Sequence, residues 1–116
     1  MGIILENHMT EKVINIEDLE KSASHASDLL KAMSNQTRLI ILCQLLKGEK
    51  TAGELDSATQ LSQSALSQHL AVLREHGLVQ TRRQSQNIYY SLSGDEPRAI
   101  IEVLYNIYSQ GDEGCA

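Results

Sequence analysis

The sequence is poor in cysteine, proline and aromatic residues, and these shortages exclude several classes of protein. Its 116 residues include two cysteines, one proline, four tyrosines and no phenylalanine or tryptophan. Two cysteines cannot form the disulfide framework of a small secreted domain, and they are too few thiols for a structural zinc site. A core without large aromatic side chains must be filled by aliphatic ones, which is typical of packed helices.

Long apolar runs are missing as well. No stretch of about 18 apolar residues is present, so we expect neither a membrane span nor a membrane partner. Residues 1–9 lack the basic start and the apolar stretch of a secretory signal, and we therefore expect a cytoplasmic protein. His8-Met9 resembles a cloning junction, so residues 1–8 are either vector-derived or native, and we expect one domain at residues 9–116.

The charge is unevenly distributed along the chain. The net charge is -5 at pH 7, which taken alone argues against a nucleic-acid partner. Residues 62–92, however, carry Arg74, Arg82 and Arg83 against the single acid Glu75, while the segments before and after them are acidic. Because phosphate attraction depends on local charge, this segment is the candidate DNA-binding surface.

The spacing of apolar residues predicts two helices in the first half of the chain. From Ile16 to Met33 they recur every three or four residues, which indicates one helix. Asn35 can cap a second helix over about residues 36–47. The side chains that we expect on its inward face are Leu39, Leu42, Cys43 and Leu46.

The next two predicted helices have the outline of a helix-turn-helix. Thr51 and Glu54 form a capping box at the start of a short third helix that ends near Ala58. Ser62 can cap a fourth helix, which ends at Gly77-Leu78 in a Schellman motif. Leu66, Leu70 and Leu73 face inward, and the outward face carries small and amide side chains: Gln63, Ser64, Ser67, Gln68 and Ala71.

After Gly77 the pattern alternates in the way of two β-strands. Residues 78–83 and 88–92 form a hairpin with a polar turn at 84–87, and this hairpin is the expected wing, with Arg82 and Arg83 near its tip. Asp95 or Ser93 can cap a last helix that tolerates Pro97 in its first turn. The predicted fold is therefore mainly α with a small β-hairpin, a winged helix-turn-helix of order α-α-α-α-β-β-α.

The last helix is apolar around well over half of its circumference. The residues concerned are Ala99, Ile100, Ile101, Val103, Leu104, Ile107 and Tyr108. Because so small a domain cannot bury both sides of this helix by itself, we expect a homodimer formed by the first and last helices.

The polar face of the fourth helix presents groups that can read base edges in a major groove. The predicted DNA-binding residues are Gln63, Ser64, Ser67, Gln68 and His69 on the helix, and Arg82, Arg83 and Gln86 on the wing, with Gln84 assisting. The alternative interpretation is an ordinary solvated helix face and two solvated arginines.

The two cysteines are open to more than one interpretation. Cys43 lies on an inward stripe, where an inert buried thiol is common, and Cys115 lies in the acidic stretch Gly111–Ala116. They can form a disulfide only if their Cα atoms come within about 7 Å. The scattered histidines His8, His25, His69 and His76 form no metal-ligand pair, so we expect neither a metal nor another cofactor.

The chain resembles the ArsR/SmtB family of bacterial repressors over about residues 17–108. The resemblance is carried by Leu30–Asn35, Arg38-Leu39, Gly53–Leu55, Leu61–Leu70, Leu73-Arg74 and Gly77–Val79. Within that family it is similar to the HlyU, BigR and SqrR branch, which senses oxidants or reactive sulfur through thiols. The metal ligands of other members are absent, since Leu55-Asp56-Ser57 stands where they have a cysteine pair, and the last helix lacks their Asp, His and Glu ligands.

The resemblance implies a redox role for Cys43, which matches the cysteine on the second helix of the thiol-sensing branch. That branch has its partner near the end of the last helix, where this chain has Ser109, and Cys115 follows six residues later. Three alternatives for the function of the cysteines are therefore open: a two-cysteine switch, a single-thiol sensor and a regulator without redox sensing.

We therefore expect a sequence-specific DNA-binding repressor rather than an enzyme. Its expected partners are an inverted-repeat operator, a second copy of the chain and an oxidant or reactive-sulfur inducer. Two other classes are weighed against it. A small thiol peroxidase would turn over peroxide without salt-dependent DNA binding, and a winged-helix protein-interaction module would form no salt-sensitive DNA complex.

Overall fold

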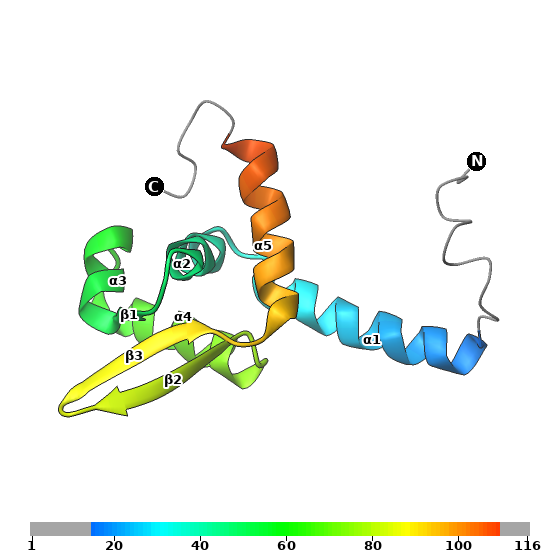
Figure 1. Ribbon diagram of the computed structural model, residues 1–116, viewed down its shortest axis with the longest axis horizontal. Helices are drawn as coiled ribbons and strands as arrows, with labels where there is room; N and C mark the ends of the chain where they lie inside the picture. Colours follow the sequence, from blue (N-terminus) through cyan, green and yellow to red (C-terminus); the bar gives the residue numbers. More distant parts are fainter. Residues whose placement is uncertain (1–14, 110–116) are drawn as a thin grey trace.

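The protein is represented by a computed structural model that describes residues 15–109. Within that range the order of elements is α1 (Ile16–Met33), α2 (Gln36–Leu46), β1 (Lys50–Thr51), α3 (Ala52–Thr59), α4 (Gln63–Glu75), β2 (Val79–Gln84), β3 (Asn87–Leu92) and α5 (Asp95–Tyr108). Helices α3 and α4 form a helix-turn-helix, and β2 with β3 forms the wing that extends from it (Figure 1). The predicted winged helix-turn-helix is confirmed.

Side-chain caps fix where four of the helices begin: Asn15 caps α1, and the other three caps are those that the sequence predicts. Asn35 and Ser62 each accept a hydrogen bond from the backbone N–H three residues later, at 3.0 and 3.1 Å. Thr51 and Glu54 complete the capping box, because each side chain accepts the backbone N–H of the other, at 3.2 and 2.8 Å. These bonds satisfy amides that have no partner within the helix.

Helix α4 ends in the predicted Schellman motif. The N–H of Leu78 donates to the carbonyl of Leu73 at 2.8 Å, and the N–H of Gly77 donates to that of Arg74 at 3.1 Å. Gly77 has a φ of 74°, a left-handed conformation that costs glycine little. The chain therefore passes from α4 into β2 through only three residues, His76, Gly77 and Leu78.

The core lies between α2, α4, the base of the hairpin and the start of α5. Helix α2 packs against α3, α4, α5 and β3, and its Ile41, Leu42 and Leu45 are completely buried. The predicted inward stripe was therefore too narrow: of its four residues only Leu42 is fully buried. A helix that is surrounded on several sides buries more than one row of side chains. The spacing of apolar residues therefore does not identify all of its core residues.

Two local features differ from the sequence-based expectation. The N-cap of α5 is Gly94, and neither Asp95 nor Ser93 caps the helix by its side chain. Ser93 instead donates its backbone N–H to Leu78 at 2.9 Å, which keeps it beside the sheet, and Gly94 turns the chain with a φ of 84°. Strand β1, which was not predicted, pairs antiparallel with β3 and gives the sheet order β1-β3-β2.

Helices α1 and α5 leave much of their apolar surface uncovered. Helix α1 projects away from the rest of the described chain (Figure 1), and only Ala32 and Met33 at its end are buried. Its apolar residues Ile16, Leu19 and Leu30 are 51–66% exposed. On α5 the exposed apolar residues are Val103, Ile107 and Tyr108, at 53–74%.

Candidate DNA interface and thiol pocket

The outward face of α4 has the form that the sequence predicts for a reading helix. Leu66, Leu70 and Leu73 are buried and hold the helix against the core. The opposite face is exposed along its length and carries Gln63, Ser64, Ser67, Gln68 and Ala71. We call the first four of these the amide-hydroxyl ridge. Each of its side chains can both donate and accept hydrogen bonds at base edges, and none is large enough to keep the helix out of a major groove.

His69 does not lie on the amide-hydroxyl ridge. It is half-buried, and its Nδ1 lies 3.4 Å from a terminal guanidinium nitrogen of Arg38 on α2. The Nε of Arg38 also donates to the carbonyl of Ala32 at 2.6 Å. Arg38 therefore connects the end of α1, the start of α2 and the middle of α4.

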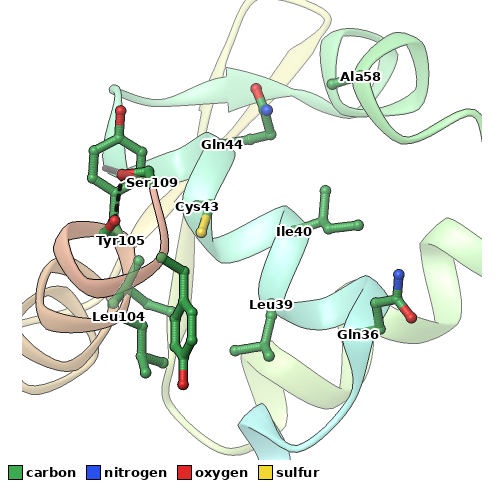
Figure 2. Close-up of a pocket in the computed structure, with 11 residues that line it drawn as sticks. Gln36, Leu39, Ile40, Cys43, Gln44, Ala58, Leu104, Tyr105 and Ser109 are labelled. Carbon is green, nitrogen blue, oxygen red and sulfur yellow. Dashed lines mark hydrogen bonds between the residues drawn. The ribbon is translucent and has the colours of Figure 1, made fainter. Parts of the chain in front are cut away.

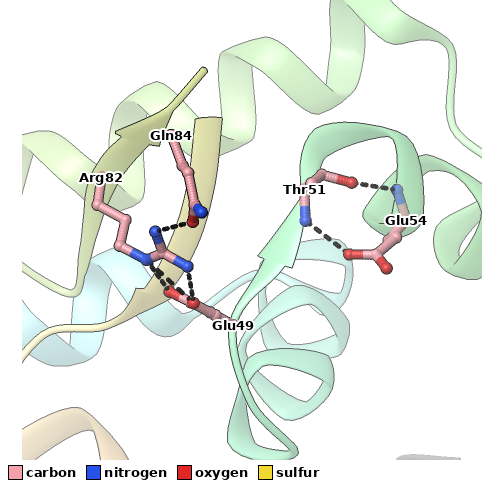
Figure 3. Close-up of polar contacts among 5 residues, drawn as sticks. All are labelled: Glu49, Thr51, Glu54, Arg82 and Gln84. Atoms are coloured by element: carbon pink, nitrogen blue, oxygen red, sulfur yellow. Dashed lines mark hydrogen bonds and ion pairs between the residues drawn. The ribbon is translucent and has the colours of Figure 1, made fainter. Parts of the chain in front are cut away.

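The two wing arginines have different surroundings. Arg82 binds Glu49, which directly precedes β1: its Nε lies 3.0 Å from both carboxylate oxygens, and one terminal nitrogen lies 2.5 Å from Oε1 (Figure 3). The other terminal nitrogen donates to Gln84 at 2.7 Å. The guanidinium also lies 4.5 Å from the ring centroid of Tyr89. Arg83, in contrast, is exposed and forms no ion pair with any residue of the range 15–109.

The ion pair perturbs both of its members. The hydrogen bonds from Arg82 hold the pKa of the Glu49 carboxyl below its usual value. The same bonds raise the pKa of Arg82 above its ordinary value. Both groups are therefore fully charged at neutral pH. Gln86 is exposed in the two-residue turn at the tip of the wing.

Cys43 lies at a cavity of about 500 Å³ between α2 and α5. In Figure 2 its sulfur faces α5, with Leu39 and Ile40 on its own helix and Leu104 and Tyr105 opposite. No Lys, Arg, Asp or Glu of the described chain lines this cavity. Cys43 is disulfide-bonded, and residues 15–109 contain no free cysteine.

The second predicted redox residue, Cys115, lies outside the described residues. Ser109 lines the same cavity as Cys43, and its hydroxyl donates to the carbonyl of Tyr105. The position that, by the resemblance, corresponds to the partner cysteine of the thiol-sensing branch therefore lines the same cavity as Cys43. The possible vector-derived segment, residues 1–8, is also outside the described range.

Residues 15–109 contain neither a metal-binding cluster nor a membrane-spanning helix. No group of three or more His, Cys, Asp or Glu side chains in this range is arranged to hold a metal ion. None of its helices is both long enough and apolar enough to cross a membrane.

Sequence reasoning did not identify Glu49, Tyr89 or Arg38 as part of the candidate site. Strand β1 brings Glu49 to the wing. This strand has only two residues, which is too short for an alternating pattern to be recognised in the sequence. Knowledge of the strand register would have suggested the contact between Glu49 and Arg82. Tyr89 on β3 lies opposite Thr51 of β1 on one side and opposite Arg82 of β2 on the other.

Known proteins similar to this chain are DNA-binding regulators. Residues 35–81 match the family described as "Bacterial regulatory protein, arsR family". The chain is 51% identical to the transcriptional activator HlyU of Vibrio cholerae over 86% of this chain and 93% of that protein. It is 41% identical to the biofilm growth-associated repressor of Xylella fastidiosa over 87% of this chain and 84% of that protein. The structure of reduced HlyU from Vibrio cholerae N16961 is similar with a TM-score of 0.76 and 53% identity, over 79% of this chain and 97% of that one.

Proposed function

The chain belongs to the ArsR family of bacterial regulatory proteins, and from this membership we propose that it is a homodimeric, thiol-regulated repressor. Its function is DNA-binding transcription regulation rather than catalysis, because that is what the family does. The observation that carries the finer proposal is the combination of an exposed amide-hydroxyl ridge on α4 with a cysteine at a cavity between α2 and α5.

In the proposed complex each α4 lies in a major groove. Gln68 and Gln63 can form paired hydrogen bonds with adenine, and the serines Ser64 and Ser67 can contact either bases or phosphates. Arg83 supplies the free cation of the wing and Gln86 assists it at the tip, because Arg82 is already bonded to Glu49. His69 contributes through its contact with Arg38 rather than from the ridge.

The uncovered faces of α1 and α5 support a two-fold dimer. Their exposed apolar residues would lose contact with water if a second copy packed against them, and each large aliphatic side chain so buried contributes about 1.5–3 kcal/mol. A two-fold dimer presents two copies of α4. We therefore expect an inverted-repeat operator with half-sites about one or two helical turns apart.

Repression follows if the dimer occupies a promoter and excludes polymerase. The names of the relatives differ on this point, since one is a transcriptional activator and another a repressor. Transcription in vitro from a promoter that contains the operator should fall as protein is added. A rise in transcript would contradict repression and leave DNA binding intact.

The thiol part of the proposal joins Cys43 to Cys115. Ser109 lines the Cys43 cavity, and the six residues from Ser109 to Cys115 can span at most about 20 Å, so Cys115 is within reach. Formation of the bridge removes two protons and two electrons from the two thiols. With hydrogen peroxide as oxidant, the peroxide O–O bond breaks and two waters form.

A bridge at Cys43 can affect DNA binding through helix α2. Cys43 and Arg38 are on this helix, and Arg38 contacts His69 on α4. Release of DNA then requires that the bridged dimer favours a placement of the two α4 helices that fits the operator less well.

DNA reading is tested on duplexes selected by the protein from a randomised pool. The Gln68→Ala variant should bind its best duplex about 1–3 kcal/mol more weakly by fluorescence anisotropy, because it loses a bidentate base contact. Gln80→Ala is the matched control, since Gln80 is exposed on β2 outside the amide-hydroxyl ridge. Equal affinities of the wild-type protein and the Gln68 variant would remove the ridge from the proposed interface.

Redox control is tested on the same duplex with reduced and peroxide-treated protein. Oxidation should weaken binding of the wild-type protein and leave Cys43→Ser and Cys115→Ser unchanged, and mass spectrometry should find the bridge only in the wild type. If Cys115→Ser still responds, Cys43 acts as a single-thiol sensor. If oxidised and reduced wild-type protein bind alike, the chain is a regulator without redox sensing.

A further inference from the structure

The strongest unassigned feature is the set of contacts made by Arg82 on the wing. All three of its guanidinium nitrogens are engaged: two bind the Glu49 carboxylate and the third donates to Gln84 (Figure 3). The face of Tyr89 lies beneath the same group. The carboxylate occupies the edge formed by Nε and one terminal nitrogen, and Gln84 takes an N–H of the other, so three of the five N–H groups are engaged.

The sheet places these residues in one row. Arg82 lies opposite Tyr89, and Tyr89 lies opposite Thr51. Because side chains alternate along a strand, Glu49 projects from the same face as Thr51, and Gln84 from the same face as Arg82. Arg83 projects from the other face. The contact between Glu49 and Arg82 is therefore built into the strand register.

We propose that Glu49 competes with DNA phosphates for Arg82 and thereby withholds one of the two wing arginines from sequence-independent binding. A carboxylate presents two oxygens to a guanidinium much as a phosphate does. The side chains of Arg82 and Glu49 are 49% and 36% exposed, so a phosphate can approach the pair. To bind the same edge of the guanidinium, however, it must displace a carboxylate that is already in place.

The competition limits how tightly the protein binds DNA of any sequence. Phosphate contacts strengthen binding to every duplex, whereas base contacts strengthen binding to the operator only. An arginine withheld from phosphates therefore lowers the affinities for operator and random DNA by about the same factor. Glu49 is thus a positioning residue that limits sequence-independent affinity through Arg82, and this inference rests on the proposed contact of the wing with DNA.

The test compares salt dependence on two duplexes, one selected from a randomised pool and one of random sequence. Glu49→Gln should steepen the slope of log K against log salt concentration by about 0.9, which corresponds to one added phosphate contact. It should also tighten binding to both duplexes several-fold and by about the same factor, because a phosphate contact does not depend on sequence. Arg82→Gln alone should leave the slope nearly unchanged, and the double variant should return to the wild-type slope.

Glu102→Gln on α5 is the matched control, because it makes the same change in net charge at an exposed acid without an ion pair in the described range. The inference is overturned if Arg82→Gln alone flattens the slope by about 0.9, or if Glu49→Gln behaves like Glu102→Gln. It is also overturned if Glu49→Gln weakens binding and the added Arg82→Gln change does not reverse the effect, since the pair would then only support the fold of the wing.

These outcomes are separable from the failure of the proposed function. If the pool yields no enriched sequence, sequence-specific regulation fails, whatever the variants do on the random duplex. If the pool yields an operator and the Glu49 variant matches the control, only the role of Glu49 fails.

Discussion

The helix-turn-helix body and the two outlying helices differ in how they bury apolar surface. In the body, which runs from α2 to β3, Leu55, Leu73 and Leu78 are completely buried. Helix α1 has 18 residues, of which only two are buried, and α5 has 14 residues, of which two are buried. The body thus supplies most of a core that Ala32 and Met33 of α1 and Ile101 of α5 complete, whereas the remaining apolar residues of these two helices are largely uncovered.

The largest expected effect is a loss of folding stability when leucine is replaced by alanine, and we compare this substitution in the body and in α1. Leu73→Ala should lower the free energy of unfolding by about 2–5 kcal/mol, because it leaves a cavity in the core. Leu30→Ala on α1, at a residue that is 53% exposed, should change it far less in the monomer. Urea denaturation at a fixed low protein concentration measures both. Equal losses would show that Leu30 contributes to the core as much as Leu73 does.

An intermediate effect is expected when a charge is placed on the uncovered face of α5. Ile107→Asp should shift the proposed dimer to monomer in analytical ultracentrifugation, because the new carboxylate would have to be desolvated in the proposed interface. Asn106→Asp introduces the same charge at a neighbouring exposed residue. If the Ile107 variant stays dimeric, or if both variants dissociate, the uncovered face of α5 is not the contact that we propose.

The smallest effect is expected at a cap within the body. Ser62→Ala removes the acceptor for a backbone N–H at the start of α4 and should cost about 1 kcal/mol of unfolding free energy. Ser64→Ala, two residues later on the exposed face, is the comparison and should cost less than about 0.5 kcal/mol. Thermal melting of the two variants side by side resolves the difference. Indistinguishable melting curves would mean that the cap contributes little to the stability of the body.

The sequence was sufficient to predict the parts of the fold that depend on local signals. The caps at Asn35, Thr51 and Ser62 and the Schellman motif at Gly77 all use side chains or backbone conformations within a few residues of one another. The period of Leu66, Leu70 and Leu73 then fixed which face of α4 points outward. The amide-hydroxyl ridge could be located for the same reason.

Features that depend on contacts between distant segments could not be predicted. Glu49 and Arg82 are 33 residues apart and meet because β1 adds to the hairpin. Arg38 and His69 are 31 residues apart in the sequence. His69 was expected on the exposed face of α4, but it is half-buried beside Arg38. The full burial of Ile41 and Leu45 likewise reflects the number of elements around α2.

The short connection between α4 and the wing limits how far these two elements can move relative to each other. Gly77 and Leu78 alone separate the C-cap of α4 from β2, and Leu78 is completely buried. In the proposed complex, this short buried connection would keep the spacing between the bases contacted by α4 and the backbone contacted by the wing nearly constant. In the proposed dimer, a signal that releases DNA would then act by changing the distance or angle between the two copies of this helix and hairpin.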